Sequence, residues 1–175
     1  MMKITEKQLT EYIQQYIDHK GDSVMKRKWD MMLIHRLQYD KLYNNIPCSK
    51  LWITHIEKHI ENLKKLKDFD LLYQKIKLMA DQFDGIGKLT IYDTATCIGF
   101  EMNVFPTKVY LHAGAAIGAK ALGIKGAIVS KKHFVDMCCA FNKLEPAQIE
   151  DFLCIYKKRL LGESNENLTV CGGCC

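Results

Sequence analysis

Turn-forming residues are scarce in this chain of 175 residues, which holds only 3 proline and 11 glycine residues. A β-sandwich joins many short strands through turns that these residues favour, so their scarcity argues against a turn-rich all-β fold. Long hydrophobic runs are missing too, because Lys120 and Lys125 interrupt the most apolar stretch, and a membrane span needs about 18 consecutive apolar residues. The first seven residues lack the apolar core of a signal peptide. We therefore expect a cytoplasmic protein with no membrane partner.

The composition is typical of a soluble globular protein, with 48% hydrophobic and 26% charged residues. We expect one compact helical domain over residues 1–162 and a flexible cysteine-containing tail over residues 163–175. The 8 cysteines show no spacing typical of a disulfide framework, which agrees with a reducing cytoplasm. The net charge of +5 is compatible with a polyanion partner and equally with plain solubility. Nothing in the pattern determines an oligomeric state.

Apolar residues recur at spacings of three and four almost throughout, which is the period of an amphipathic helix. We find no convincing alternating strand and therefore predict an all-α fold. A capping box at Thr5-Glu6-Lys7-Gln8 predicts the first helix start. Ser49 is expected to cap a helix that turns Leu51 and Trp52 inward. The expected helices after the first are 22–43, 50–66, a segment from Asp68 or Asp70 to about 83, 88–100, 107–122, 131–141 and 146–161.

One stretch, residues 82–123, carries most of the functional information. A predicted helix ends at Phe83, a Gly-Ile-Gly turn follows, and a new helix begins at Lys88. The two glycines can take positive φ, and we expect Ile86 between them to insert into the core. The amides at the helix start then attract an anion, and such a turn binds a phosphate without reading base sequence. The candidate nucleic-acid-binding residues are Gly85, Ile86, Gly87, Lys88, Leu89, Thr90, Lys120 and Lys125.

The sequence Gly85-Ile86-Gly87 completes a hydrophobic-x-Gly-hydrophobic-Gly pattern and resembles the hairpin of the helix-hairpin-helix DNA-binding motif. Over residues 80–123 the chain is similar to the helix-hairpin-helix DNA glycosylase family. Thr90 stands three residues after the second glycine, as in that family, and Val109-Tyr110-Leu111-His112 matches its Val-Asp-x-His segment. The resemblance implies a helical scaffold with its hairpin part at about residues 78–123 and a DNA partner. We expect no cofactor, with a monovalent cation at the hairpin as the one alternative.

The chain departs from this family at the residues that perform its chemistry. Tyr110 takes the position of the catalytic Asp, and Leu89 takes that of the Lys used by the bifunctional members. A tyrosine cannot replace a carboxylate that stabilises a developing sugar cation. The resemblance therefore supports the scaffold and the DNA contact rather than base excision. Tyr110 and His112 are the candidate catalytic residues.

Small residues fill the expected helix that ends at Gly123. Gly114 and Gly118 stand four residues apart and share one face of it. Each glycine costs a helix about 1 kcal/mol relative to alanine, so close packing of another helix or a ligand should offset the cost. We favour close helix packing, and we expect His112 at the helix start to be structural.

Two patterns have metal-ligand spacing. Cys171, Cys174 and Cys175 in the tail are candidate ligands, but a structural zinc site needs four ligands and no second pair is near in sequence. His55 and His59 are four residues apart, without the glutamate position of a catalytic zinc helix. We expect a flexible, reactive tail and no metal at either place.

Three functions remain open. We favour a non-catalytic nucleic-acid-binding domain that grips the phosphate backbone through the hairpin. The alternative is a helical protein-interaction or scaffold domain with no nucleic-acid role, and a weaker one is a diverged DNA glycosylase-like enzyme. The first depends on the lysines between residues 85 and 133, which are Lys88, Lys108, Lys120, Lys125, Lys131 and Lys132.

Overall fold

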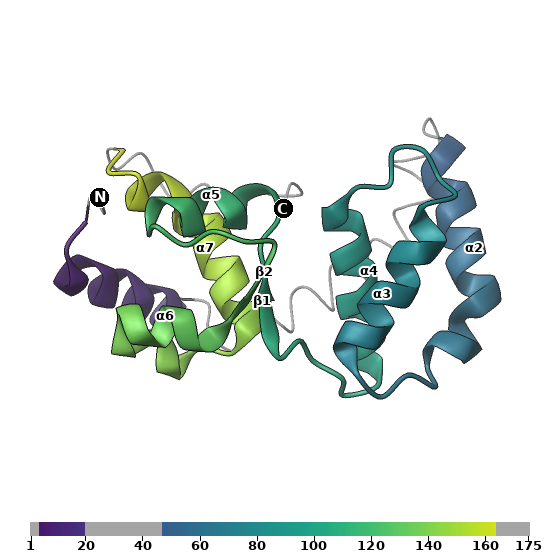
Figure 1. Cartoon of the computed structure of the whole chain (residues 1–175), viewed down its shortest axis with the longest axis horizontal. Coiled ribbons are helices and arrows are strands. Elements are labelled where there is room, and N and C mark those ends of the chain that lie inside the picture. The colour runs from purple at the N-terminus through teal and green to yellow at the C-terminus, as the bar shows by residue number, and fades with distance from the viewer. Residues whose placement is uncertain (1–3, 20–46, 164–175) are drawn as a thin grey trace. The chain divides into compact units, whose positions relative to one another are not determined.

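The computed structural model describes residues 4–19 and 47–163 of the chain. It is predominantly helical, which confirms the predicted fold class (Figure 1). Where the sequence suggested one helical body, the contacts divide the chain into two compact units. Unit 1 comprises Met1–Val24 and Thr107–Cys175, and unit 2 comprises Met25–Pro106. Unit 2 is therefore an insertion between two segments of unit 1.

The N-terminal helix spans residues 6–19 and begins with the predicted capping box. The Thr5 hydroxyl accepts a hydrogen bond from the Gln8 amide at 3.2 Å, and the Gln8 side chain accepts one from the Thr5 amide at 2.9 Å. The box supplies side-chain acceptors for two amides that have no carbonyl acceptor within the helix. The buried face of this helix, which packs on the core of unit 1, consists of Leu9, Ile13 and Tyr16.

The described part of unit 2 folds into three helices: α2 (Pro47–Leu63), α3 (Phe69–Ala80) and α4 (Lys88–Glu101). The helix α3 packs against both α2 and α4. Of the two predicted caps, Asp68 and Asp70, it is Asp68 that caps α3, because its carboxylate accepts the Leu71 amide at 2.9 Å. On the buried side of α3, the ring of Phe69 meets the ring of Tyr92 edge-on, with 6.1 Å between their centroids.

The helix α2 differs from its prediction at its start and in one inward residue. It begins at Pro47, whose fixed φ suits the first turn of a helix, rather than after a cap at Ser49. Trp52 is buried as expected, but Leu51 is 62% exposed, so the inward face of α2 does not include it. The helix expected over residues 22–43 lies outside the described residues.

A short antiparallel strand pair in unit 1 corrects the prediction of a helix over residues 107–122. The strand β1 (Lys108–Tyr110) pairs with β2 (Ile128–Ser130), and Val109 faces Val129 across the pair. The helix that follows β1 starts only at residue 113. A three-residue strand is too short to show a period, and its partner is about 20 residues away, so local periodicity did not reveal it.

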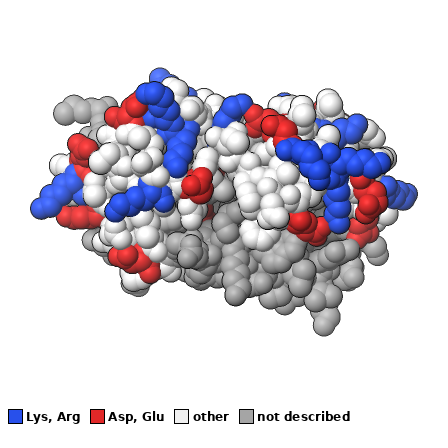
Figure 2. All heavy atoms as spheres, turned by 90° about the horizontal axis from the view of Figure 1, so that it is seen from below, with Lys and Arg blue, Asp and Glu red and all other residues white. Residues whose placement is uncertain are grey.

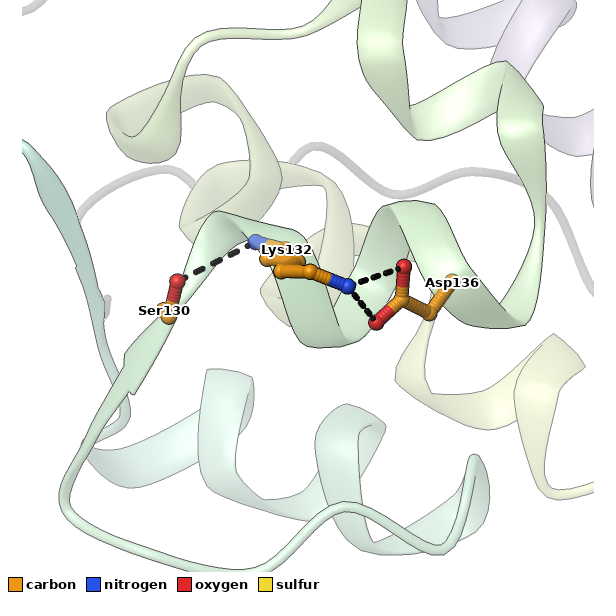
Figure 3. Close-up of polar contacts among 3 residues, drawn as sticks. All are labelled: Ser130, Lys132 and Asp136. Carbon is orange, nitrogen blue, oxygen red and sulfur yellow. Dashed lines mark hydrogen bonds and ion pairs between the residues drawn. The ribbon is translucent and has the colours of Figure 1, made fainter.

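The rest of unit 1 consists of α5 (Ala113–Ala121), α6 (Lys131–Met137), the 3₁₀ turn η1 (Cys139–Lys143) and α7 (Pro146–Leu160). The predicted helix over residues 131–141 therefore ends earlier and continues as a 3₁₀ turn. The hydroxyl of Ser130 caps α6 as predicted, accepting the Lys132 amide at 3.3 Å (Figure 3). Gly123 and Gly162 follow α5 and α7 with φ of 81° and 73°, the left-handed conformation typical of a helix end.

The helices α5 and α7 pack closely against each other in unit 1. A Cβ added at Gly118 would lie 2.3 Å from the Leu153 carbonyl oxygen, and one added at Gly114 would lie 2.6 Å from the Cys154 Sγ. Only glycine at position 118 lets the two backbones approach this closely, and a methyl group at position 114 would overlap side chains of α7. Close helix packing therefore explains both glycines, as the sequence analysis favoured.

Among the described helices, none has the length and the apolar composition that crossing a bilayer requires.

We predict that Gly118→Ala lowers the free energy of unfolding by about 1–3 kcal/mol, because its methyl group would overlap the backbone of α7. Helix propensity alone would raise the free energy of unfolding by about 1 kcal/mol. The sign of the measured change therefore shows whether overlap with α7 outweighs helix propensity. Chemical denaturation measures it. The control is Ile117→Ala, at the next residue, whose side chain is 47% exposed and should matter little. A stabilised Gly118→Ala variant would contradict the close packing.

Candidate functional site

The loop between α3 and α4 contains one glycine in the left-handed region. Gly85 has φ of 84°, whereas Gly87 has φ of −87° and ψ of 172° and forms the N-cap of α4. Backbone strain from a side chain is therefore expected at Gly85 and not at Gly87. A Cβ at either glycine would meet no atom within 4 Å, so the outer surface of the loop is open.

Phe83, rather than Ile86, anchors this loop. Ile86 is only half-buried, which corrects the expectation that it inserts into the core. The Phe83 ring lies edge-on to Trp52 of α2, with 5.5 Å between centroids, and 5.1 Å from the ring of His55. The Trp52 indole in turn donates a 3.4 Å hydrogen bond to the Thr94 hydroxyl on α4. The start of α4 is thus held by aromatic contacts to α2.

The first turn of α4 presents amides that its N-cap does not satisfy. The Ile91 amide donates to the Gly87 carbonyl at 3.1 Å, so the amides of Lys88, Leu89 and Thr90 precede the helical hydrogen bonds. Gly87 has no side chain that could accept them. Gly87 and Lys88 are exposed, and Leu89 and Thr90 are half-buried. Chemically, this arrangement can bind an anion through backbone amides, the helix dipole and one ammonium group.

Three other helix starts in the described residues are capped by side chains. Side-chain oxygens of Thr5, Asp68 and Ser130 accept first-turn amides of their helices. The start of α5 also lacks a side-chain cap, but its N-cap, His112, is buried. The start of α4 therefore combines an uncapped first turn with an exposed N-cap.

The predicted lysines are divided between the two units. Lys88 belongs to unit 2, while Lys120 and Lys125 belong to unit 1, where both are exposed. The Lys132 ammonium is held by Asp136 at 2.6 Å (Figure 3), and the Lys131 ammonium donates to the Asn142 carbonyl at 3.3 Å. In the face that Figure 2 shows, basic and acidic side chains of the described residues are interspersed.

The two candidate catalytic residues are buried. Tyr110 is 2% exposed on β1, and His112 is 7% exposed at the start of α5. His112 Nδ1 lies 3.8 Å from the Glu150 carboxylate of α7. Neither side chain is presented to a substrate, so this pair offers no open catalytic site.

Sequence reasoning missed the polar cluster to which this histidine belongs, formed by Tyr16, His112, Glu150 and Asp151. The Tyr16 hydroxyl donates a 3.1 Å hydrogen bond to Asp151, and all four residues are buried. Burial first, and then the neighbouring Asp151 and Glu150 carboxylates, raise the pKa of Tyr16 above its usual range. One signal was present in the sequence, because adjacent acidic residues interrupt the apolar face of α7.

No metal site is formed by the residues that the structure describes, since no three His, Cys, Asp or Glu side chains gather there. The rings of His55 and His59 lie 4.8 Å apart, and the His55 ring also contacts Phe83. The cysteine tail, with Cys171, Cys174 and Cys175, lies outside the described residues, so its flexible, metal-free state stays a prediction. The monovalent cation at the hairpin likewise stays a prediction.

Comparison with protein-family models, with curated proteins and with solved structures gives no match to this chain. The functional argument therefore depends on the geometry alone.

We predict that the stability of the protein falls as the pH rises above about 10, where an ordinary tyrosine ionises. Below that pH, Tyr16 is neutral in both the folded and the unfolded chain. Above it, the unfolded chain loses the proton while the raised pKa keeps the folded residue neutral, so the free energy of unfolding decreases. Urea denaturation between pH 8 and pH 11 measures this decrease.

In Tyr16→Phe the alkaline decrease should become smaller, and stability at pH 7 should fall by about 1–3 kcal/mol because the buried Asp151 loses its donor. Tyr12→Phe is the matched control, since Tyr12 lies half-buried on the same helix. Equal effects of the two substitutions at pH 7 would show that the Tyr16–Asp151 hydrogen bond does not stabilise the fold.

Proposed function

We propose that the protein binds the phosphate backbone of nucleic acid, without catalysis, through the start of α4. The observation that carries the proposal is the exposed and uncapped first turn at Gly87, with Lys88 beside it. A phosphate oxygen supplies the acceptor that the amides of this turn require. The helix–glycine turn–helix order of α3 and α4 agrees with the resemblance to the helix-hairpin-helix motif.

The charge distribution favours weak binding without sequence preference. Residues 47–106 carry eight lysines and eight acidic residues, so unit 2 supplies no strong basic field from this part of the chain. Asp84 lies exposed in the same loop and adds a negative charge near the amides. Contacts to phosphate position a protein on a duplex but carry no base information. The expected complex is therefore salt-sensitive and of low affinity.

The substitution Gly87→Asp separates binding from folding. An aspartate at the N-cap accepts the first-turn amides and complements the helix dipole, so we expect the protein to gain about 0.5–1 kcal/mol of stability. The same carboxylate occupies the anion site and repels phosphate, so DNA affinity should fall about tenfold, equivalent to about 1.4 kcal/mol. Thermal melting and fluorescence anisotropy with a labelled duplex measure the two effects.

Gly87→Asn is its control, because asparagine caps the helix without a charge. It should stabilise the protein similarly and weaken DNA binding less than aspartate does. If Gly87→Asp binds DNA as tightly as the wild type, the amides of α4 are not the binding site.

Lys88→Glu tests the contribution of the ammonium group. We expect about a tenfold loss of duplex affinity and a salt slope shallower by about 0.9, the value for one lost phosphate contact. Lys67→Glu makes the same charge change at an exposed lysine before α3, at the opposite end of that helix from the loop. Titrations at two salt concentrations compare the variants. Equal losses for both would indicate a general charge effect instead of a local site.

A further inference from the structure

A groove of about 510 Å³ runs between α2 and α3 in unit 2. Its lining includes the buried side chains of Leu63 and Met79 and the half-buried Leu66. On α3, Leu71 and Leu78 line the same groove and stand seven residues apart, which places them two turns apart on one face. The groove therefore presents an apolar strip about two helical turns long.

The two leucines of α3 are unusually exposed for their type. Leu71 is 60% exposed and Leu78 is 63% exposed. A single exposed leucine is common on protein surfaces, but two on the edge of one apolar groove form a continuous patch. A patch of this kind fits the apolar face of a second helix, whose anchor residues recur at spacings of three, four and seven.

The charges around the groove indicate the chemistry of that helix. Among the described residues that line the groove, Lys75 is the charged one and His59 carries an imidazole. No carboxylate from the described residues lines the groove. Lys75 lies between Leu71 and Leu78 on α3 and is exposed. A bound helix with acidic residues beside its apolar face would pair with Lys75, whereas one with basic residues would be repelled.

Charged residues along α3, at its ends as well as in the groove, disfavour a second copy of this chain as the occupant. A symmetric, antiparallel pairing of α3 would set Leu71 against the copy's Leu78. The two-fold axis of that pairing would also set Asp68 against the copy's Asp81 and bring the two Lys75 side chains close together. Like charges that face each other are destabilising, so the apolar match would be opposed by repulsion.

We propose that this groove, lined by Leu71, Lys75 and Leu78, docks an amphipathic helix with acidic flanks from a protein partner. The surface is separate from the start of α4, so the proposal does not depend on nucleic-acid binding.

Two synthetic helical peptides test it with the full chain. Both carry leucines at positions i, i+4 and i+7, one with glutamates and the other with lysines beside the leucine face. We expect the acidic peptide to bind at least about tenfold more tightly than the basic one in fluorescence anisotropy. Equal binding of the two, or no binding of the acidic peptide, would overturn the proposal.

Substitution of exposed leucines provides the matched controls. Leu71→Gln and Leu78→Gln should each weaken the acidic peptide about tenfold or more, because each removes an apolar anchor. Leu51→Gln changes a leucine that is equally exposed, at 62%, but does not line the groove, and it should bind normally. Unchanged binding by Leu71→Gln would refute the assigned surface. So would self-association of the wild type that Leu71→Gln abolishes, since a second copy would then occupy the groove.

Discussion

The first turn of every α-helix leaves amides that need acceptors from outside the helix, and this requirement governs how the chain is assembled. Thr5, Asp68 and Ser130 supply side-chain oxygens at the starts of three helices. At α4 the N-cap is Gly87, which supplies none, and the turn is exposed. An anion such as phosphate has the acceptor oxygens and the negative charge that such a helix start favours. The start of α4 is thus an exposed helix start whose N-cap supplies no side-chain acceptor.

The packing inside each unit determines which of its residues are buried and which are exposed. In unit 1, Gly118 brings α5 against the backbone of α7, and the Tyr16–Asp151 hydrogen bond ties the N-terminal helix to α7. His112 is buried in the same unit, where its ring lies beside the Glu150 carboxylate of α7. In unit 2, the contact of Phe83 with Trp52 holds the loop before α4 on α2. In unit 1, Gly118, Tyr16 and His112 are therefore part of the internal packing. In unit 2, the start of α4 at Gly87 and Lys88 is exposed.

Local signals predicted the local features well. The capping box at Thr5, the cap at Asp68 and the start of α4 at Lys88 all depend on residues within four positions of one another, and the structure contains them. The strand pair was missed because β1 and β2 meet through contacts about 20 residues apart. The Tyr16–Asp151 hydrogen bond joins residues 135 positions apart, which no periodicity can reveal. For the candidate site, the glycine turn and Lys88 were predictable, but the sign of φ at Gly87 depends on how the whole loop is anchored.

The most direct test of the central claim is an amide-resolved NMR titration of the full chain with a short DNA duplex. The account predicts that the amide resonances of Lys88, Leu89 and Thr90 shift with saturation, and that raising the salt concentration reverses the shifts. A titration in which DNA shifts only resonances of unit 1, such as those of Lys120 and Lys125, would contradict it. So would the absence of any saturable shift at low salt.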